Sequence, residues 1–390
     1  MNRATPPLLR RLNERTVLEA VRDGAPISRA EISRRAGISK PTVSLALQSL
    51  LEAGLVREAP APAGPSYGAV YFEPVPEAAL VFGLDLGARF LRGAISDLSG
   101  QVRARQDVEL REAHVDEALA LLGGLRDSLL GAAGFSADLV DSVVVGVPGV
   151  VESATGALRL AANLQGLEGR RLADDLAAEL GLPVVLENDI NLAALGERWL
   201  GVARGVSDFA FLSIGTGMGT GLVLGGEVRR GFHGAAGEID FALGGLGDEL
   251  DPSAPGVSVL TQRLVEESPG ATKLKPPYDV RATFAAARAG DAVALGVVDE
   301  VSRRIALHIA PIAAVADVGL VILGGGIGSN GDLLLERVRW NLERWLPYPP
   351  RVEASSLGEG AVLTGALAYG LRASLDSVFA SGARSALVRA

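Results

Sequence analysis

FAFLSIGTGMGTGLVLGGEVRRG, residues 209–231, decides the fold that this chain of 390 residues is expected to adopt. An apolar strand runs into a glycine-rich turn, a second strand follows, and a Gly-Gly turn leads into a third strand. Residues 78–110, AALVFGLDLGARFLRGAISDLSGQVRARQDVEL, repeat this order of strands and turns. After each copy come a helix and a further apolar strand, at 115–132 and 142–149 and again at 293–316 and 319–328. The repeat predicts a duplicated α/β body with two lobes and a cleft between them.

The glycine turns of the two lobes are candidates for binding phosphate. Backbone amides of such a turn can approach an anion closely, and a nearby hydroxyl or carboxylate can add a hydrogen bond or hold Mg²⁺. A plain turn would explain each cluster alone, because the chain has 49 glycines, but the matched positions in both lobes favour phosphate binding. The candidate phosphate or nucleotide residues are Asp85, Gly87, Gly215, Thr216, Gly217, Gly219, Gly325 and Gly326.

A second candidate site lies in LPVVLENDINLAALGERWLG, residues 182–201. An apolar strand there delivers Glu187, Asn188 and Asp189 to the start of a helix. An amide and a carboxylate side by side can bind the hydroxyls of a polyol, and Asp189 could act as general base towards one of them. The alternative is that Asn188 and Asp189 only cap the helix.

The N-terminal segment has the pattern of three helices. The first, residues 7–22, is expected to turn Leu12, Val17, Leu18 and Val21 inward. The second opens with the S-x-x-E spacing of a capping box at Ser28 and Glu31, turns Ile32 and Ala36 inward, and ends at Gly37. The third, within GISKPTVSLALQSLLEAGLV (37–56), is capped by Ser39, has Pro41 in its first turn, and buries Val43, Ala46, Leu47 and Leu50.

Two short helices joined by a Gly-containing turn, the second with small polar residues at its front, predict a helix-turn-helix that reads the DNA major groove. The candidate DNA-binding residues are Arg34, Arg35, Ser39, Lys40, Thr42, Ser44 and Gln48. A three-helix protein-docking module is the alternative. LVREAP (55–60) and GAVYFEP (68–74) predict two strands of a wing, whose tip contains no Lys or Arg, so its contribution to DNA binding stays open.

Charge and composition narrow the classes of protein. The net charge is −9, yet residues 1–60 hold ten Lys and Arg against six Asp and Glu, which fits a DNA-binding head and ordinary scatter equally well. Zero cysteines exclude disulfides and thiolate zinc sites, and His114, His233 and His308 are too scattered to build a metal site. No uninterrupted apolar run reaches about 18 residues, which argues against a membrane helix and for a cytoplasmic protein.

The motifs together resemble those of the ROK family (repressors, open reading frames and sugar kinases) over nearly the whole chain. The matching segments are GLDLG (83–87), VGVPG (145–149), NLQGLEG (163–169), LENDINLAALGE (186–197), IGTGMGTGLV (214–223), GFHGAAGEI (231–239), LGGGIG (323–328) and GEGAVLTGALAYG (358–370). The resemblance implies an α/β protein in which a winged helix-turn-helix precedes a two-lobed, actin-like ATPase (ribonuclease H-like) sugar-kinase fold. In the family, the residues matching Asn163, Asn188, Asp189 and Glu238 bind sugar hydroxyls, and the one matching Asp189 is the catalytic base of kinase members.

The chain departs from the family pattern at two places. Its first phosphate loop carries Arg89 where kinase members have a small hydroxyl residue. Asp240-Phe241 stands where the family has Gly-His, the histidine of a zinc site, and no cysteine follows to complete that site. A further sugar-binding glutamate has no assignable match, although Glu249 is near.

These departures favour a sugar-responsive transcriptional regulator, most simply a repressor, that requires no cofactor and no zinc. The alternative is an ATP- and Mg²⁺-dependent sugar kinase with an accessory DNA-binding head. The expected partners are an operator in double-stranded DNA and a monosaccharide, with no membrane partner, and the family resemblance implies a homodimer or dimer of dimers. The predicted divisions are a head at 1–60 with its wing to about 74, wing tip and linker at 61–77, lobes at 78–200 and 201–375, and a tail at 376–390.

Overall fold

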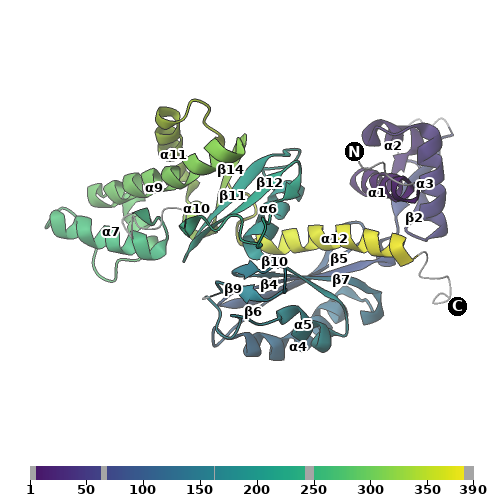
Figure 1. The fold of residues 1–390 in the computed structure, drawn as a ribbon, viewed down its shortest axis with the longest axis horizontal. Coiled ribbons are helices and arrows are strands. Elements are labelled where there is room, and N and C mark those ends of the chain that lie inside the picture. Colours follow the sequence, from purple (N-terminus) through teal and green to yellow (C-terminus); the bar gives the residue numbers. More distant parts are fainter. Residues whose placement is uncertain (1–5, 63–67, 162, 242–249, 382–390) are drawn as a thin grey trace. The chain divides into compact units, whose positions relative to one another are not determined.

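The computed structural model describes residues 6–62, 68–161, 163–241 and 250–381 (Figure 1). The chain divides into two compact units. Unit 1 comprises Met1–Val145, Leu172–Leu186 and Ala366–Ala390, and unit 2 comprises Gly146–Arg171 and Glu187–Gly365. The units interleave along the chain, whereas the divisions drawn from the sequence are continuous, and those divisions stay a prediction.

The head, at the start of unit 1, combines helices with a small sheet. Its elements are α1 (Pro6–Gly24), β1 (Ile27–Ser28), α2 (Arg29–Ala36), α3 (Lys40–Glu52), β2 (Val56–Ala59), β3 (Tyr71–Pro74) and the 3-10 helix η1 (Pro76–Ala78). β3 lies between β1 and β2 and pairs antiparallel with both. β2 and β3 are the predicted wing strands, whereas β1 is too short to leave a pattern in the sequence. Residues 63–67 of the wing tip lie outside the described residues.

The head has a core of its own. Its buried side chains include Val17, Leu18, Val21, Ile32, Val43, Ala46, Leu47, Leu50 and Phe72. Leu98, from the turn after β5, packs into the same cluster, and its amide donates to Pro76 O at 3.1 Å. The prediction for Leu12 is wrong, because this side chain is 47% exposed. The buried stripe of α1 is Glu14, Val17, Leu18 and Val21. Two residues are about 200° on a helix, so Leu12 points away from the side that Glu14 faces.

The serine caps of α2 and α3 form as predicted, whereas the Glu31 carboxylate of the expected capping box pairs with Arg34 and Arg35. Ser28 Oγ accepts from Glu31 N at 3.3 Å, and Ser39 Oγ accepts from Thr42 N at 3.4 Å. α2 ends at Gly37 in the left-handed region with φ 65°, which glycine adopts without strain. The turn between the two helices is therefore fixed by local hydrogen bonds.

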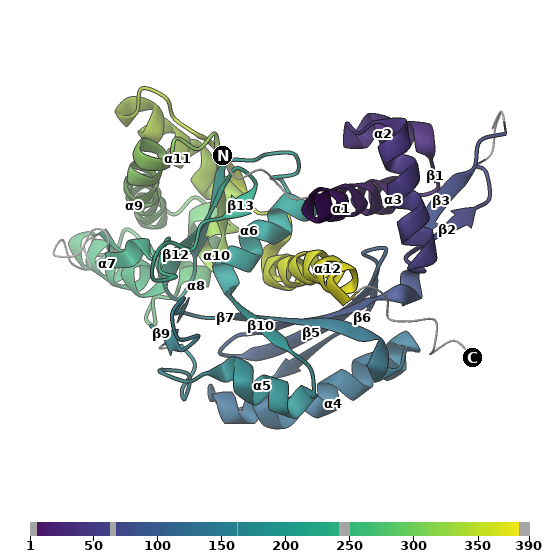
Figure 2. The same ribbon diagram turned by 45° about the vertical axis from the view of Figure 1, so that its right-hand side comes forward.

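The rest of unit 1 is built on a five-stranded sheet. Its strands are β4 (Leu80–Leu86), β5 (Phe90–Asp97), β6 (Val102–Glu109), β7 (Val140–Val147) and β10 (Val184–Asn188), in the order β10-β7-β4-β5-β6. The helices are α4 (Val115–Ala133), η2 (Ala137–Leu139) and α5 (Leu172–Leu180), with α4 and α5 on one face of the sheet (Figure 2). A Cβ at Gly93 would lie 2.9 Å from Leu129 Cδ1 of α4, so the helix packs directly on the strand.

Unit 2 contains the second five-stranded sheet. Its strands are β11 (Phe209–Ile214), β12 (Met218–Leu224), β13 (Glu227–Val228), β14 (Leu320–Gly324) and β15 (Arg351–Ala354), in the order β13-β12-β11-β14-β15, with a separate pair β8 (Val150–Val151) and β9 (Leu158–Arg159). Its helices are α6 (Asp189–Trp199), η3 (Ile239–Phe241), α7 (Ala254–Glu267), α8 (Val280–Arg288), α9 (Ala292–Ala316), α10 (Gly325–Gly328), α11 (Gly331–Trp345) and η5 (Gly358–Gly360).

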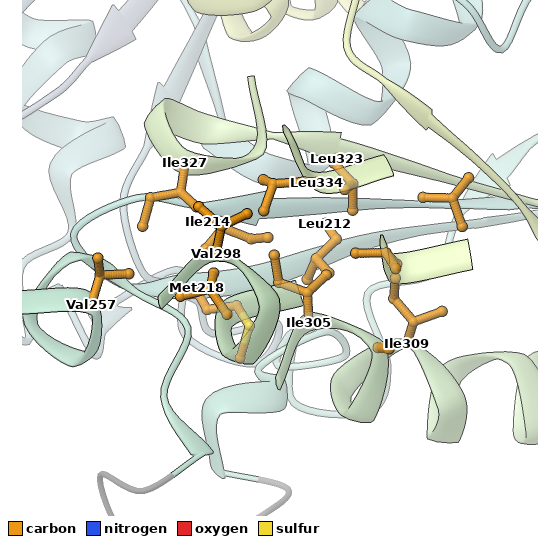
Figure 3. Close-up of a cluster of buried hydrophobic side chains, with 14 of the residues drawn as sticks. Leu212, Ile214, Met218, Val257, Val298, Ile305, Ile309, Leu323, Ile327 and Leu334 are labelled. Atoms are coloured by element: carbon orange, nitrogen blue, oxygen red, sulfur yellow. The ribbon is translucent and has the colours of Figure 1, made fainter. Parts of the chain in front are cut away.

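The two sheets confirm the duplication that the sequence predicts. In each, a central strand pairs antiparallel with the next strand along the chain, and a later strand joins its other edge. In unit 2, Val298, Ile305 and Ile309 of α9 pack on one face against Leu212 and Leu323 (Figure 3). Ala193 and Ala194 of α6 pack with Phe209 and Phe211 on the other face.

Helix α12 (Ala361–Ser381) begins in unit 2 and continues into unit 1 at Ala366. In unit 2, a Cβ at Gly365 would lie 1.7 Å from Leu192 O of α6, so the two backbones touch. In unit 1, a Cβ at Gly370 would lie 2.3 Å from Val81 Cγ1 of β4. Glycines thus let α12 pack closely in both units. Over the described part of the chain, no helix combines the length and apolar character needed to span a bilayer.

Candidate functional site

The predicted DNA-binding residues lie on the end of α2 and the outer side of α3, away from the core of the head. Arg34, Arg35, Ser39, Lys40 and Gln48 are exposed, and Thr42 and Ser44 are half-buried. Their front is ordered, since the Ser39 and Thr42 hydroxyls lie 2.8 Å apart. Arg34 and Arg35 share the Glu31 carboxylate, which Arg35 Nε reaches at 3.0 Å. The arginines are therefore held along α2, facing solvent.

The candidate sugar site belongs entirely to unit 2. Asn188 is the N-cap of α6: its Oδ1 accepts from Asn191 N at 3.0 Å, and its Nδ2 donates to Gly149 O at 2.9 Å. The capping alternative is thus correct for the geometry of Asn188. An amide has two N–H groups and two acceptor lone pairs, so one of each stays available for a ligand. Asp189 Oδ1 accepts from Ile190 N at 2.8 Å at the first position of the helix.

Glu187 positions this helix start, a role the sequence did not reveal. The side chain is buried, and its Oε1 accepts from Asn188 N and from Asn191 Nδ2, both at 2.9 Å. Its Oε2 accepts from Arg230 Nε at 2.6 Å. A buried carboxylate needs such compensation, and here it ties Asn188 to the segment that leads to Glu238. The sequence feature that could have identified this role is the glutamate that opens the Glu-Asn-Asp motif.

Glu238 directly precedes η3, in a segment that lies beside strand β12. Thr220 N donates to Gly237 O at 2.8 Å, and a Cβ at Gly219 would lie 2.5 Å from Ile190 Cδ1 and 3.9 Å from Gly237 O. The residues following Asp189 and preceding Glu238 therefore flank one position of β12. Burial raises the pKa of Glu238, and the charge of Asp240 adds to the rise.

Asn163 is exposed in the segment after β9. A Cβ at Gly149, whose carbonyl holds Asn188, would lie 2.5 Å from Arg159 O and 3.0 Å from Ala161 Cα. The chain leading to Asn163 thus passes the residue that orients Asn188. Unit 2 holds all four predicted sugar-binding residues, and these contacts link the segments that carry them.

The phosphate-loop residues divide between the units. Gly215, Thr216 and Gly217 form the turn between β11 and β12, and Gly219 lies in β12. A Cβ at Gly325 would lie 2.4 Å from Ile214 O, so the glycines at 325 and 326 adjoin this turn. The turn amide of Met218 donates to Asp240 Oδ2 at 3.1 Å.

Asp85 and Gly87 belong to unit 1, at the end of β4. Asp85 is buried and pairs with Arg92 Nη1 at 3.1 Å, directly across the β4–β5 ladder. Burial raises the pKa of Asp85 to about 6, although Arg92 opposes the rise. Arg89, the unusual residue of this loop, is exposed and lies 3.8 Å from Glu109. Arg92, rather than Arg89, is the cation that reaches the loop carboxylate.

The residues present do not fit the zinc site of the family. The chain supplies no thiolate, and Asp240 is engaged with the Met218 amide. Glu249 lies in 242–249, outside the described residues. Among the residues that the structure describes, no group of three or more His, Cys, Asp or Glu is placed to hold a metal ion. That the protein needs neither zinc nor another cofactor stays a prediction.

The fold and the clustered polar residues define a class of protein: a winged helix-turn-helix joined to an actin-like sugar-kinase body. The ROK family model matches residues 81–242 and 263–372, and the MarR family model matches residues 11–64. The chain therefore belongs to the ROK family, and the predicted family and fold class are confirmed.

The relatives that match the chain include both a putative repressor and sugar kinases. It is 29% identical to a putative xylose repressor of Caldicellulosiruptor sp. (strain Rt8B.4), over 93% of this chain and 96% of the relative. It is 29% identical to a glucokinase of Halalkalibacterium halodurans, over 67% of this chain and 85% of that enzyme. The fold is similar to a crystal structure of a ROK family transcriptional regulator, homologue of the E. coli MLC protein, with TM-score 0.78, 23% identity and coverage of 96% and 98%.

A ROK family glucokinase from Streptomyces griseus, crystallised with glucose and AMPPNP, matches with TM-score 0.64 and 25% identity, over 75% of this chain and 99% of that one. The glucokinase leaves a quarter of this chain unmatched, whereas the regulator covers nearly all of it. The match to the MarR family model lies at residues 11–64, within the head.

Proposed function

We propose that this protein is a sugar-responsive transcriptional repressor that binds operator DNA through its head and a monosaccharide through unit 2. The observation that carries the proposal is the combination in one chain of a capped helix-turn-helix with an exposed polar face and a kinase-like sugar site. The xylose repressor relative supports it, because the similarity extends over 96% of that protein, head included.

The sugar would be bound by Asn163, Asn188, Asp189 and Glu238. Carboxylates accept from sugar hydroxyls, and the fixed Asn188 amide offers one donor and one acceptor in a defined direction. The Glu187–Arg230 pair holds Asn188 before the ligand arrives, which reduces the entropy cost of binding. This set of groups selects a polyhydroxylated molecule.

DNA binding would place the front of α3 in the major groove, with Lys40 and the hydroxyls at base edges and Arg34 and Arg35 at phosphates. The protein would act in the cytoplasm as a homodimer or dimer of dimers, each pair of heads reading two half-sites. Sugar binding changes the spacing of the heads and hence the affinity for the operator. Such coupling is typically about 1–3 kcal/mol, roughly a 5- to 150-fold change in affinity.

A fluorescence anisotropy titration with duplex DNA from the protein's own promoter region tests the DNA half of the proposal. K40A and R35A are each expected to weaken binding about five-fold or more, since contacts to bases and phosphates are worth about 1–3 kcal/mol. K275A, which removes an exposed cation from unit 2, is the matched control and leaves affinity unchanged at the same salt concentration. Equal binding by K40A, R35A and wild type contradicts the proposal.

Thermal-shift screening of the full chain against hexoses, pentoses and their N-acetyl derivatives tests the sugar half. The stabilising sugar is expected to lose its effect in D189N, while DNA affinity persists. D317N, the same change at an exposed helix end, keeps the sugar response. If D189N and wild type are stabilised alike, Asp189 does not bind the sugar.

Sugar kinase activity is the second candidate, favoured by the similarity to glucokinases and by Asp189 at the start of α6. If the protein is a kinase, it phosphorylates a sugar with ATP, and D189N abolishes this activity. No turnover over the same sugar panel with ATP and Mg²⁺ would rule it out.

A further inference from the structure

The glycine-rich turn of unit 2 is hydrogen-bonded to a carboxylate of the chain itself, that of Asp240. Asp240 Oδ2 accepts from Met218 N at 3.1 Å, at the point where the turn enters β12. The same oxygen would lie 3.8 Å from a Cβ at Gly217. Inside the turn, Gly215 N donates to Gly217 O at 2.9 Å. Two amides that could face a phosphate are thus used within the chain, one of them by a carboxylate.

The backbone places Asp240 on this turn. Gly237 has φ 103°, and a Cβ there would lie 1.8 Å from Thr220 O, so only glycine fits. Thr220 N and Ile239 N both donate to Gly237 O at 2.8 Å, which fixes the segment on β12 just before the 3-10 helix that carries Asp240. The carboxylate is therefore delivered by a pinned segment rather than by a freely moving loop.

The surroundings of Asp240 oppose a second anion. Partial desolvation of its carboxyl group beside the turn raises the pKa of Asp240, and the charge of Asp251 adds to the rise, whereas the Met218 amide and His308 act in the opposite direction. Glu238 stands two residues before it and also has a raised pKa. Phosphate oxygens brought to this turn would meet Asp240 at contact distance, and like charges at that range repel strongly.

In unit 1, the carboxylate near the matching glycine turn is paired with a cation instead of a backbone amide. Asp85, which in a phosphate loop would face Mg²⁺ or its water, is paired with Arg92, and Arg92 Nε lies 3.3 Å from Asp107 Oδ2. The Arg92 side chain is 13% exposed, so its charge stays close to these carboxylates. A guanidinium thus meets the carboxylate that a metal ion would meet.

We propose that Asp240 is an intramolecular substitute for phosphate: its carboxylate holds the Gly215–Met218 turn and excludes nucleotide polyphosphates. The body then binds its sugar without nucleotide, and residue 240 determines that selectivity. The inference concerns nucleotide recognition only, and it stands whether or not the head binds DNA.

The test is isothermal titration of the full chain with ATP·Mg²⁺ and with inorganic tripolyphosphate. D240N keeps an acceptor for the Met218 amide and removes the charge, and D240G removes the whole side chain. Both are expected to bind the two probes at least ten-fold more tightly than wild type. D317N removes one negative charge elsewhere in unit 2 and is expected to behave as wild type.

Thermal unfolding of each variant establishes that it is folded before titration. The proposal is overturned if D240N and D240G bind the polyphosphates no more tightly than D317N. It is also overturned if wild type binds ATP·Mg²⁺ as tightly as D240N does. DNA affinity, measured in parallel, reports on the repressor function separately.

Discussion

The two glycine turns of the body, after β4 in unit 1 and after β11 in unit 2, occupy the same place in duplicated sheets and differ in the group that their aspartate meets. The first ends beside a buried acid that an arginine neutralises, and the second gives an amide to an acid from a later segment. Asp85 is buried within its sheet, whereas Asp240 is exposed. The same scaffold thus carries a different set of charged groups in each half.

The largest expected effect breaks the buried pair of unit 1. R92A leaves Asp85 buried without its cation and is expected to lower the free energy of unfolding by about 3–5 kcal/mol. Denaturant unfolding followed by circular dichroism measures it. R89A, on the same loop but exposed, is expected to cost no more than about 1 kcal/mol. Equal losses of unfolding free energy in R92A and R89A would contradict the claim that the buried Asp85–Arg92 pair stabilises the fold more than an exposed charge on the same loop does.

The dependence of the unfolding free energy on pH tests the buried Asp85 of unit 1 separately. The pKa of Asp85 is about 6 in the folded protein, above the ordinary 3.8, so the folded state binds this proton more tightly than the unfolded state does. Its contribution to stability therefore grows as pH falls through about 6, by about 1 kcal/mol between pH 7 and pH 5. The difference in unfolding free energy between wild type and D85N, followed over this range, isolates the effect. A difference that is constant with pH would contradict the raised pKa.

The smallest expected effect concerns unit 2. Because Asp240 is exposed and Asn can still accept from the Met218 amide, D240N is expected to change the free energy of unfolding by no more than about 0.5 kcal/mol. Its consequence should appear in anion binding instead. A loss comparable to that of R92A would show that both turns depend on their counter-ions for stability.

The sequence predicted what local pattern determines. Glycines at strand ends and apolar runs identified the lobes, and the caps at Ser28 and Ser39 identified the helix-turn-helix. The Asp85–Arg92 pair was also within reach, because a short turn between β4 and β5 sets these residues opposite each other. The prediction for Leu12 failed because Glu14, paired with Arg10 Nε at 2.9 Å, takes the inward position on α1.

Contacts between distant segments were not predictable in the same way. Asp240 reaches Met218 only because Gly237 is pinned on β12, and the packing of Leu98 into the core of the head depends on the tertiary fold. Asn188 was predicted both as a ligand residue and as a possible cap. The structure confirms the cap, which uses half of its hydrogen-bonding groups, and the ligand role stays a prediction.

Helix α12 has a genetic consequence. At Gly365 its backbone touches that of α6, the helix that begins with Asp189, and at Gly370 it packs against the Val81 side chain of β4. One added methyl group at either position would shift the helix without altering any residue that is predicted to contact sugar or DNA. A selection for alleles that still bind DNA but no longer respond to the sugar should therefore recover substitutions at these glycines, far along the chain from both predicted recognition surfaces.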